Sequence, residues 1–152
     1  MPAKSRNEAS PSGDEEIRCA ARLENLDLVR SFVEHACRKA GGDEVACFSL
    51  KLAVDEACTN LVLHGYREDP GGELVVAFAD TGDRMVVTIT DSAEPFLPEA
   101  IPRPDREPGW ESRPASGLGW HLIQRTMDEV EYLPDGRNGN RLVLAKKKKT
   151  AE

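Results

Sequence analysis

The sequence lacks the features that would place it in a membrane, a secretory pathway or a nucleic-acid complex. Its apolar runs are far too short to span a bilayer, and residues 1–10 contain no apolar signal-peptide core. The formal net charge of −7 argues against nucleic acid as the main partner. A chain of 152 residues, 39% of them hydrophobic, is expected to form a single cytoplasmic domain with its own core.

The cysteines lack the spacing of a metal or redox motif. Cys19, Cys37, Cys47 and Cys58 show no C-x-x-C pair, and they fall inside predicted strands or helices. The pattern favours buried free thiols in a reducing cytoplasm over disulfides or a metal site.

Both ends of the chain are polar. Residues 1–14 have the composition of a disordered lead-in. The lysine run at 146–149 favours a solvated end over an acid-binding arm, and residues 147–152 are predicted to form a basic tail. The ordered domain is therefore predicted to cover residues 15–146.

Hydrophobic periodicity predicts a strand and two helices in the first part of the domain. Ile17 and Cys19 alternate with polar residues, as in a short strand, and residues 26–40 follow at helical spacing before a glycine pair. Asp43 is suited to cap the second helix. The core side of that helix is predicted to carry Val45, Phe48, Leu52 and Ala53.

Two hairpins and a third helix complete the predicted fold. Alternation at 74–78 and 85–89 predicts one hairpin, and strands near 130–133 and 142–144 predict the other. Apolar residues from 118 to 127 mark the third helix. The intervening segment, residues 92–116, is rich in proline and without periodicity, as in a functional loop. This order predicts an α+β two-layer sandwich, a mostly antiparallel mixed sheet with helices on one face.

A polar stripe interrupts the second helix. Glu56, Asn60 and His64 are four residues apart, and each such step turns about 40° beyond a full turn, so they share one face. The carboxylate could deprotonate a hydroxyl, and the amide oxygen could bind Mg²⁺ beside phosphate oxygens. The alternative is a solvated helix face. For His64, a helix-end or hydrogen-bonding role is favoured over catalysis. Asp55 is predicted to face solvent.

Two further polar signals lie downstream. Asp91 ends a predicted strand and could accept a hydrogen bond from an exocyclic amine such as that of adenine, although a turn-starting aspartate is the alternative. Ser116 can cap the third helix, and Gly117 and Gly119 leave N–H groups uncovered, which suits a phosphate chain. A single G-x-G also marks ordinary loop ends. The three signals together indicate a nucleotide site.

This combination resembles the ATPase domain shared by histidine kinases, type II topoisomerases, Hsp90 chaperones and MutL repair proteins, known as the GHKL or Bergerat fold. Its N-box is similar to residues 55–66 of this chain, the most specific part of the match. More closely, the sequence resembles the bacterial anti-sigma-factor serine/threonine kinases of the SpoIIAB/RsbW type. The resemblance covers the chain from about Ile17 to Lys146.

The resemblance implies ATP and Mg²⁺ as cofactors and a role for each matching residue. Glu56 would be the general base for the attacking serine, Asn60 the Mg²⁺ ligand and Asp91 the residue that reads adenine. Residues 92–116 would form a lid over ATP. The second glycine box and its neighbours would bind the phosphates, and they correspond to Arg113, Ser116, Gly117, Leu118 and Gly119.

Two positions depart from the family pattern. Ala93 stands where the family usually has the glycine of Asp-x-Gly, and Ala115 stands where many kinase members carry an arginine ahead of the glycine box. Arg113 is the nearest cation in sequence. The missing arginine bears on phosphoryl transfer more than on ATP binding.

The leading hypothesis is a serine/threonine kinase that also holds a sigma factor and phosphorylates a STAS-domain anti-anti-sigma protein. The alternative is a nucleotide-binding adaptor that sequesters a partner without catalysis. A histidine kinase is disfavoured, because no helical dimerisation domain precedes the ATPase part. The resemblance also implies a possible homodimer, and we expect no direct contact with nucleic acid or membrane.

Overall fold

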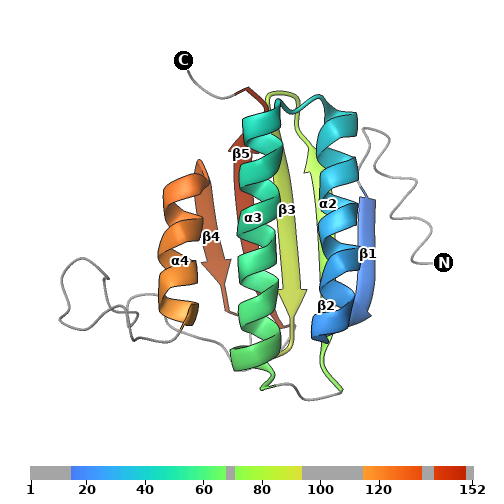
Figure 1. Cartoon of the computed structure of the whole chain (residues 1–152), viewed down its shortest axis with the longest axis vertical. Helices are drawn as coiled ribbons and strands as arrows, with labels where there is room; N and C mark the ends of the chain where they lie inside the picture. The colour runs from blue at the N-terminus through green and yellow to red at the C-terminus, as the bar shows by residue number, and fades with distance from the viewer. Residues whose placement is uncertain (1–14, 68–70, 94–114, 135–138, 150–152) are drawn as a thin grey trace.

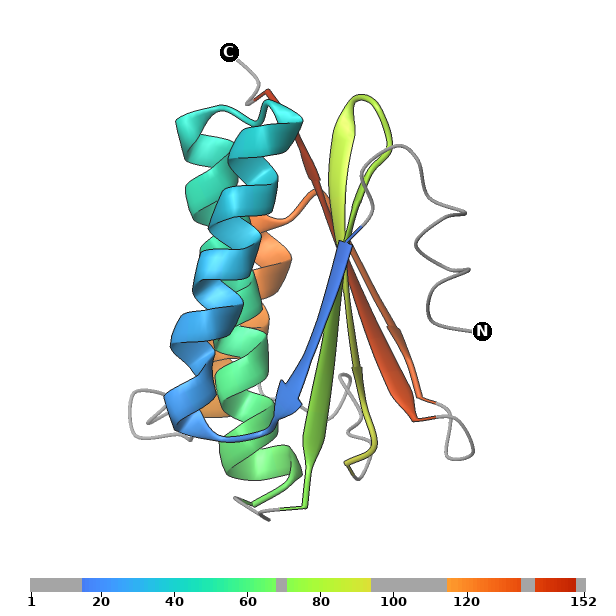
Figure 2. The ribbon, with the colours of Figure 1, turned by 90° about the vertical axis from the view of Figure 1, so that its right-hand side faces the viewer.

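The described part of the chain forms two layers, a sheet and a set of helices that covers one of its faces (Figures 1 and 2). The computed structural model describes residues 15–67, 71–93, 115–134 and 139–149. The sheet has five strands in the order β1-β2-β3-β5-β4. They are β1 (Glu15–Ala20), β2 (Glu73–Asp80), β3 (Arg84–Asp91), β4 (Glu129–Leu133) and β5 (Asn140–Lys147).

The pairing of the strands confirms the predicted hairpins and the α+β fold class. All four pairings between these strands are antiparallel, so the described sheet contains no parallel pair. Ile17 faces Val76, Val76 faces Ile89, and Ile89 faces Leu142 across the sheet. Because opposite residues share a face, these side chains form one apolar row toward the helices.

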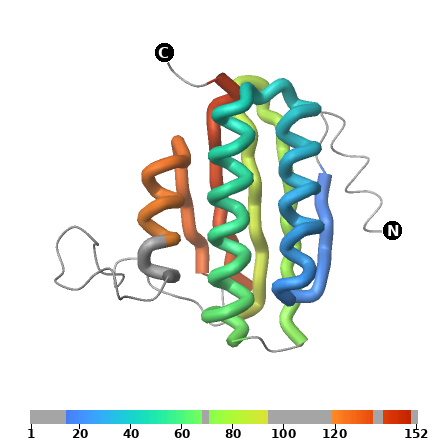
Figure 3. Tube along the Cα trace, viewed as in Figure 1, coloured from blue at the N-terminus to red at the C-terminus, as the bar shows by residue number. Residues whose placement is uncertain are grey.

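Three α-helices lie side by side on this row, with α3 between α2 and α4 (Figure 3). A short 3₁₀ turn (Leu23–Asn25) precedes α2 (Leu26–Ala40), and α3 (Glu44–Asn60) and α4 (Ala115–Thr126) follow. Asp43 caps α3 as predicted, because its Oδ1 accepts a hydrogen bond of 2.8 Å from the Ala46 N–H. None of the described helices is long and apolar enough to cross a membrane.

The core side of α3 agrees with the prediction at Ala53, which is buried, and differs from it at Val45 and Phe48. Val45 and Phe48 are 56% and 63% exposed, whereas Leu50 is fully buried. The core face is made mostly of small side chains, namely Ala46, Cys47, Ala53, Val54, Ala57 and Cys58 together with Leu50. Apolar residues occur around most of α3, so their spacing alone does not tell which side meets the sheet.

The predicted stripe also ends earlier than expected. The α-helix stops at Asn60 and continues as one π-helical turn (Leu61–Gly65), closed by the Tyr66 N–H to Leu61 O bond of 2.7 Å. A π turn takes more residues than an α turn, so the spacing of four no longer returns to the same face. His64 is accordingly exposed, while Glu56 and Asn60 are half-buried.

The cysteines and the end of the chain complete the comparison. All four cysteines are free thiols, and Cys37, Cys47 and Cys58 are buried, as predicted. Strand β5 runs through Lys147, and the Lys148 N–H bonds the Asp83 carbonyl at 3.0 Å. The first lysines of the predicted basic tail therefore belong to the end of β5, an inner strand of the sheet, and to the turn that follows it. Residues 1–14 and 150–152 lie outside the described residues.

Candidate nucleotide site

Glu56 and Asn60 both approach a glycine on the neighbouring helix. A Cβ placed on Gly119 of α4 would lie 2.4 Å from Glu56 Oε1 and 2.8 Å from Asn60 Nδ2. A side chain at this position would displace the ends of both polar side chains, so the glycine leaves them room beside α4. The structure thus brings together three of the predicted site residues, Glu56 and Asn60 on α3 and Gly119 on α4.

Burial changes the proton affinity of Glu56. Loss of solvent around the half-buried side chain raises the pKa of Glu56, and the neighbouring charge of Asp55 raises it further. Asp55 does not face open solvent as predicted, because its Oδ1 accepts a hydrogen bond of 2.5 Å from Arg30 on α2. A carboxylate with a raised pKa is a better proton acceptor for a hydroxyl than an ordinary glutamate.

Asp91 occupies the end of β3 and is only 4% exposed. Its Oδ1 accepts two hydrogen bonds, from the Ala93 N–H at 2.8 Å and from Asn140 Nδ2 at 2.9 Å. Burial raises the pKa of Asp91, and the two hydrogen bonds oppose that rise because they favour the ionised form. Asp91 therefore combines a turn-forming role with a buried carboxylate.

The structure accommodates the departure at position 93. Ala93 is buried, and its methyl group lies against Gly65, where an added Cβ would be 3.2 Å away. Tyr66 holds the same region, since its hydroxyl donates to Glu73 O at 2.8 Å and accepts from the Ser92 N–H at 2.6 Å. The end of the N-box segment is therefore packed directly against the chain that follows Asp91.

Asn140 is a site residue that the sequence reasoning missed. It is 2% exposed, and its Nδ2 also donates to Ala93 O at 2.8 Å. The alternation of apolar residues starts the last predicted strand at 142, whereas β5 already begins at Asn140. Gly139, with φ 95°, allows the approach, because a Cβ there would lie 2.4 Å from Asp91 O. The signal that could have found Asn140 is a Gly-Asn pair at the start of a strand next to β3.

The glycine box is described only in part. Helix α4 begins at Ala115, so Ser116 lies within its first turn rather than at the cap, and Gly117 and Leu118 follow. Gly119 is the fifth helical residue, past the four unpaired N–H groups, so its contribution is close approach rather than a bare N–H. Arg113 and most of the segment predicted to form a lid, residues 94–114, lie outside the described residues.

The Glu56–Asn60 pair and the Asp91–Asn140 pair lie toward the same end of the molecule, where α3 and β3 end and β5 begins (Figure 1). No cluster of three or more His, Cys, Asp or Glu side chains that could hold a metal occurs in the ranges described. The residues fit a nucleotide on two counts. The carboxylate of Glu56 and the amide of Asn60 lie together beside Gly119. Asn140 Oδ1 is a buried acceptor with no partner among the described residues.

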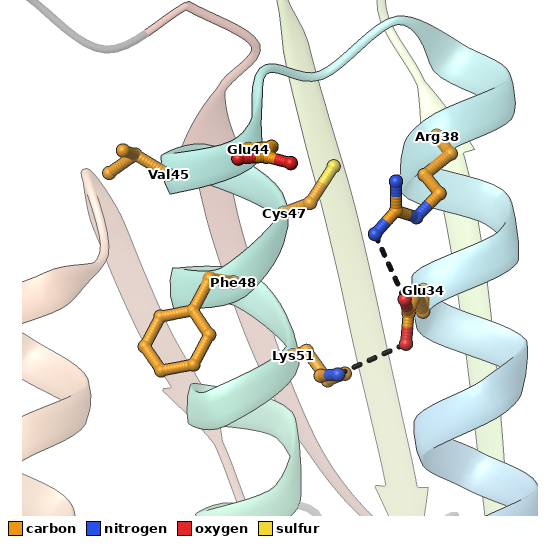
Figure 4. A pocket seen from close by; sticks show the side chains of 7 residues that line it. All are labelled: Glu34, Arg38, Glu44, Val45, Cys47, Phe48 and Lys51. Atoms are coloured by element: carbon orange, nitrogen blue, oxygen red, sulfur yellow. Dashed lines mark hydrogen bonds and ion pairs between the residues drawn. The ribbon is translucent and has the colours of Figure 1, made fainter.

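A separate hollow of about 390 Å³ lies near the start of α3 (Figure 4). Glu34 spans it by accepting bonds from Arg38 at 3.1 Å and Lys51 at 3.0 Å. Phe48 and Cys47 also line it. The hollow contains none of the residues predicted to bind a nucleotide.

The fold and this site define a histidine kinase-like ATPase domain. The model of that family matches residues 19–146, and the chain belongs to it. Among its relatives, the serine-protein kinase RsbW of Bacillus mycoides is 29% identical over 124 residues, which cover 79% of this chain and 77% of the relative. RsbW of Bacillus cereus strain AH187 matches with the same identity and coverage.

Solved structures show the same fold. The RsbU and RsbW domains of Rv1364c from Mycobacterium tuberculosis align with a TM-score of 0.63 and 18% identity, over 90% of this chain. This chain spans only 33% of that protein chain. The catalytic domain of the histidine kinase ThkA aligns with a TM-score of 0.51 and 14% identity, over 90% of this chain and 99% of that domain.

Proposed function

We propose that this protein is a cytoplasmic, ATP- and Mg²⁺-dependent serine/threonine kinase of the anti-sigma-factor type. Its substrate is a serine on a STAS-domain anti-anti-sigma protein, and it holds a sigma factor until that protein competes for it. The observation that carries the proposal is the convergence of Glu56 and Asn60 on Gly119. The similarity to RsbW serine-protein kinases supports the class of reaction. The partners follow from the resemblance to the anti-sigma-factor kinases.

The residues divide the work as follows. When bound, ATP would supply the phosphoryl group, and Mg²⁺ would neutralise the phosphate charge. The Glu56 carboxylate takes the proton of the serine hydroxyl, a role that its raised pKa favours. Asn60 offers an amide oxygen to Mg²⁺, and Asp91 offers Oδ2 to the adenine amine. The first turn of α4, with Ser116, Gly117 and Leu118, presents backbone N–H groups to the phosphates. Arg113 is the nearest cation in sequence and is proposed to bind them as well.

The second candidate is a nucleotide-binding adaptor that captures its partner without catalysis. Ala115, in the place of an arginine that neutralises phosphate charge in many kinases, favours this alternative. The two functions share the same binding site and differ only in phosphoryl transfer.

A matched pair of substitutions separates them. Glu56→Gln removes the base and keeps the size, so we expect ATP binding within about threefold of wild type and serine phosphorylation lower by about 10² or more. Glu44→Gln makes the same chemical change at the exposed start of α3 and should leave both unchanged. The measurement is transfer of labelled phosphate to STAS proteins of the same genome, with calorimetric titration of ATP.

Capture of the sigma factor should survive Glu56→Gln. If the wild type binds ATP but labels no STAS protein, and Glu56→Gln behaves like Glu44→Gln, the kinase is excluded and the adaptor remains. If the wild type does not bind ATP, both functions are excluded.

A further inference from the structure

Three sulfur atoms from three different elements lie together behind the hollow near the start of α3. The thiols of Cys37 on α2 and Cys47 on α3 are hydrogen-bonded to each other, and Cys47 Sγ also donates to Gly42 O at 3.5 Å. Met85 of β3 reaches the same glycine. The place that a Cβ would take on Gly42 lies 2.8 Å from Met85 Sδ and 3.1 Å from Cys47 Sγ. The two thiols and the thioether are therefore neighbours, and we call them the sulfur cluster.

The sulfur cluster is shielded from solvent except at one residue. Cys37 and Met85 are fully buried, whereas Cys47 is 7% exposed. Cys47 also lines the hollow of about 390 Å³, and its side chain points from α3 toward α2 (Figure 4). A small ion in the hollow therefore meets the Cys47 sulfur first and has the other two sulfurs behind it.

The atoms of the sulfur cluster select a soft metal ion. Thiolate and thioether sulfurs are ligands that suit Cu(I). A structural zinc site takes four ligands, mostly from Cys and His. The described residues contain no group of three or more His, Cys, Asp or Glu side chains that could hold a metal. Two thiols and one thioether are thus too few for zinc and sufficient for Cu(I).

The spacing of the two thiols suits a bound metal better than a disulfide. Sulfurs in hydrogen-bond contact are further apart than the roughly 2.05 Å of a disulfide bond. A metal that binds two sulfurs at about 2.3 Å each also keeps them further apart than a disulfide does. The thiols of Cys37 and Cys47 can therefore take an ion between them with less movement than an S–S bond requires.

The neighbours of Cys47 act on its proton in both directions. Burial raises the pKa of the Cys47 thiol, and the negative charges of Asp43 and Glu34 add to that rise. The hydrogen bond with Cys37 and the positive charge of Arg38 lower it. A metal ion that takes the place of the proton leaves a thiolate, which the charge of Arg38 stabilises.

We propose that Cys37, Cys47 and Met85 form a binding site for one Cu(I) ion, held by two thiolates and one thioether. Binding forms three copper–sulfur bonds, breaks the two S–H bonds and releases two protons. Copper remains Cu(I), and no sulfur is oxidised. The ion joins α2, α3 and β3 where α3 begins, whereas the proposed nucleotide site lies where α3 ends.

The first test titrates the reduced, nucleotide-free chain with Cu(I) in the absence of oxygen, in competition with a coloured Cu(I) chelator. We expect one Cu(I) per chain to be retained, with the ultraviolet absorption of thiolate-to-copper charge transfer. The melting temperature should rise, because only the folded chain holds the three sulfurs together. Zn(II), titrated against a zinc indicator, should not be retained. A chain that retains no Cu(I), or retains Zn(II) as tightly, overturns the site.

The second test locates the ion with matched substitutions. Cys37→Ala and Cys47→Ala each remove one thiolate, so Cu(I) binding should weaken more than about 100-fold, beyond the cost of losing an outer-shell partner. Met85→Leu keeps the size and removes the thioether, and should weaken binding about tenfold. Cys58→Ala makes the same change in another buried thiol of α3 and should leave Cu(I) binding unchanged.

Equal Cu(I) binding by Cys47→Ala and Cys58→Ala would show an adventitious ion only and overturn the site. If the cysteine variants do not fold, X-ray absorption at the copper edge of the loaded wild type decides. We expect three sulfur neighbours, and a nitrogen or oxygen neighbour would overturn the assignment. None of these measurements involves ATP or phosphoryl transfer, so failure of this inference leaves the proposed function intact.

Discussion

At the scale of single residues, the site depends on carboxyl groups whose pKa is shifted by burial. Loss of solvent raises the pKa of both Glu56 and Asp91. Ionising these carboxyl groups costs more free energy in the folded protein than in the unfolded chain. Asp80 shows the opposite case, since bonds from Lys148 and from the Gly82 N–H lower its pKa.

These opposite shifts predict opposite dependences of stability on pH. The raised pKa of Asp91 contributes stability that is present below its unfolded pKa and is lost as pH rises through the folded pKa. The lowered pKa of Asp80 contributes stability that is present above its unfolded pKa and is lost as pH falls.

As the pH rises from 3 to 7, the stability of Asp91→Asn should therefore increase relative to that of the wild type. The stability of Asp80→Asn should decrease relative to that of the wild type over the same range. Asparagine at 91 still offers an oxygen to Ala93 and Asn140, so its fold is preserved. Urea unfolding of the nucleotide-free proteins at several pH values measures both trends. If the stability of both variants changed in the same direction with pH, burial could not be the cause of the shift at Asp91 and hydrogen bonding the cause at Asp80.

At the scale of elements, α3 carries both the core and the site. Its small buried residues bring it close to the sheet and to α2, and its last turns bring Glu56 and Asn60 to α4. Exposed Val45 and Phe48 lie on the other side of the same helix. Which apolar side chains stabilise the fold can be tested directly.

Leu50→Ala should lower the free energy of unfolding by about 2–5 kcal/mol, because Leu50 is fully buried and leaves a cavity. Phe48→Ser, two residues away and 63% exposed, should change it by no more than about 0.5 kcal/mol. Chemical denaturation of both variants gives the comparison. A loss at Phe48 as large as that at Leu50 would place Phe48 in the core, as its spacing suggested.

At the scale of the whole molecule, the site is assembled from distant segments. Glu56 and Asn60 come from α3, Gly119 from α4, Asp91 from β3 and Asn140 from β5, and each contact depends on the sheet and helices being in register. Because the unfolded chain cannot bring these groups together, nucleotide binding and folding are coupled.

ATP with Mg²⁺ should therefore stabilise the whole fold. At a concentration of 100 times its dissociation constant, the ligand adds about 2.7 kcal/mol to the free energy of unfolding. Without nucleotide, Asn60→Ala should melt at the same temperature as the wild type. In the wild type, ATP with Mg²⁺ should raise the melting temperature more than ATP with EDTA does, and Asn60→Ala should lose most of this difference. Thermal melting in the two solutions tests this. A Mg²⁺ effect that Asn60→Ala leaves unchanged would exclude Asn60 as the metal ligand.

Most of the secondary structure could be predicted, because its signals are local. The Asp43 cap, the end of α2 before its glycine pair and the alternation of β2 and β3 all depend on neighbours in the chain. The prediction failed where competing local patterns were equally good. On α3 two apolar sides were available, and the helix was continued through His64 because a π turn has no spacing signal of its own.

The sequence by itself determined the elements, their order, the family and three of the polar groups that converge, since caps, periodicity and the N-box are properties of short segments. Only the tertiary structure decided that Asp55 pairs with Arg30, that Ala93 packs on Gly65 and that Asn140 joins Asp91. The physical reason is range. A hydrogen bond between residues 91 and 140 exists only after β3 and β5 have paired, and no local pattern in either segment records the partner.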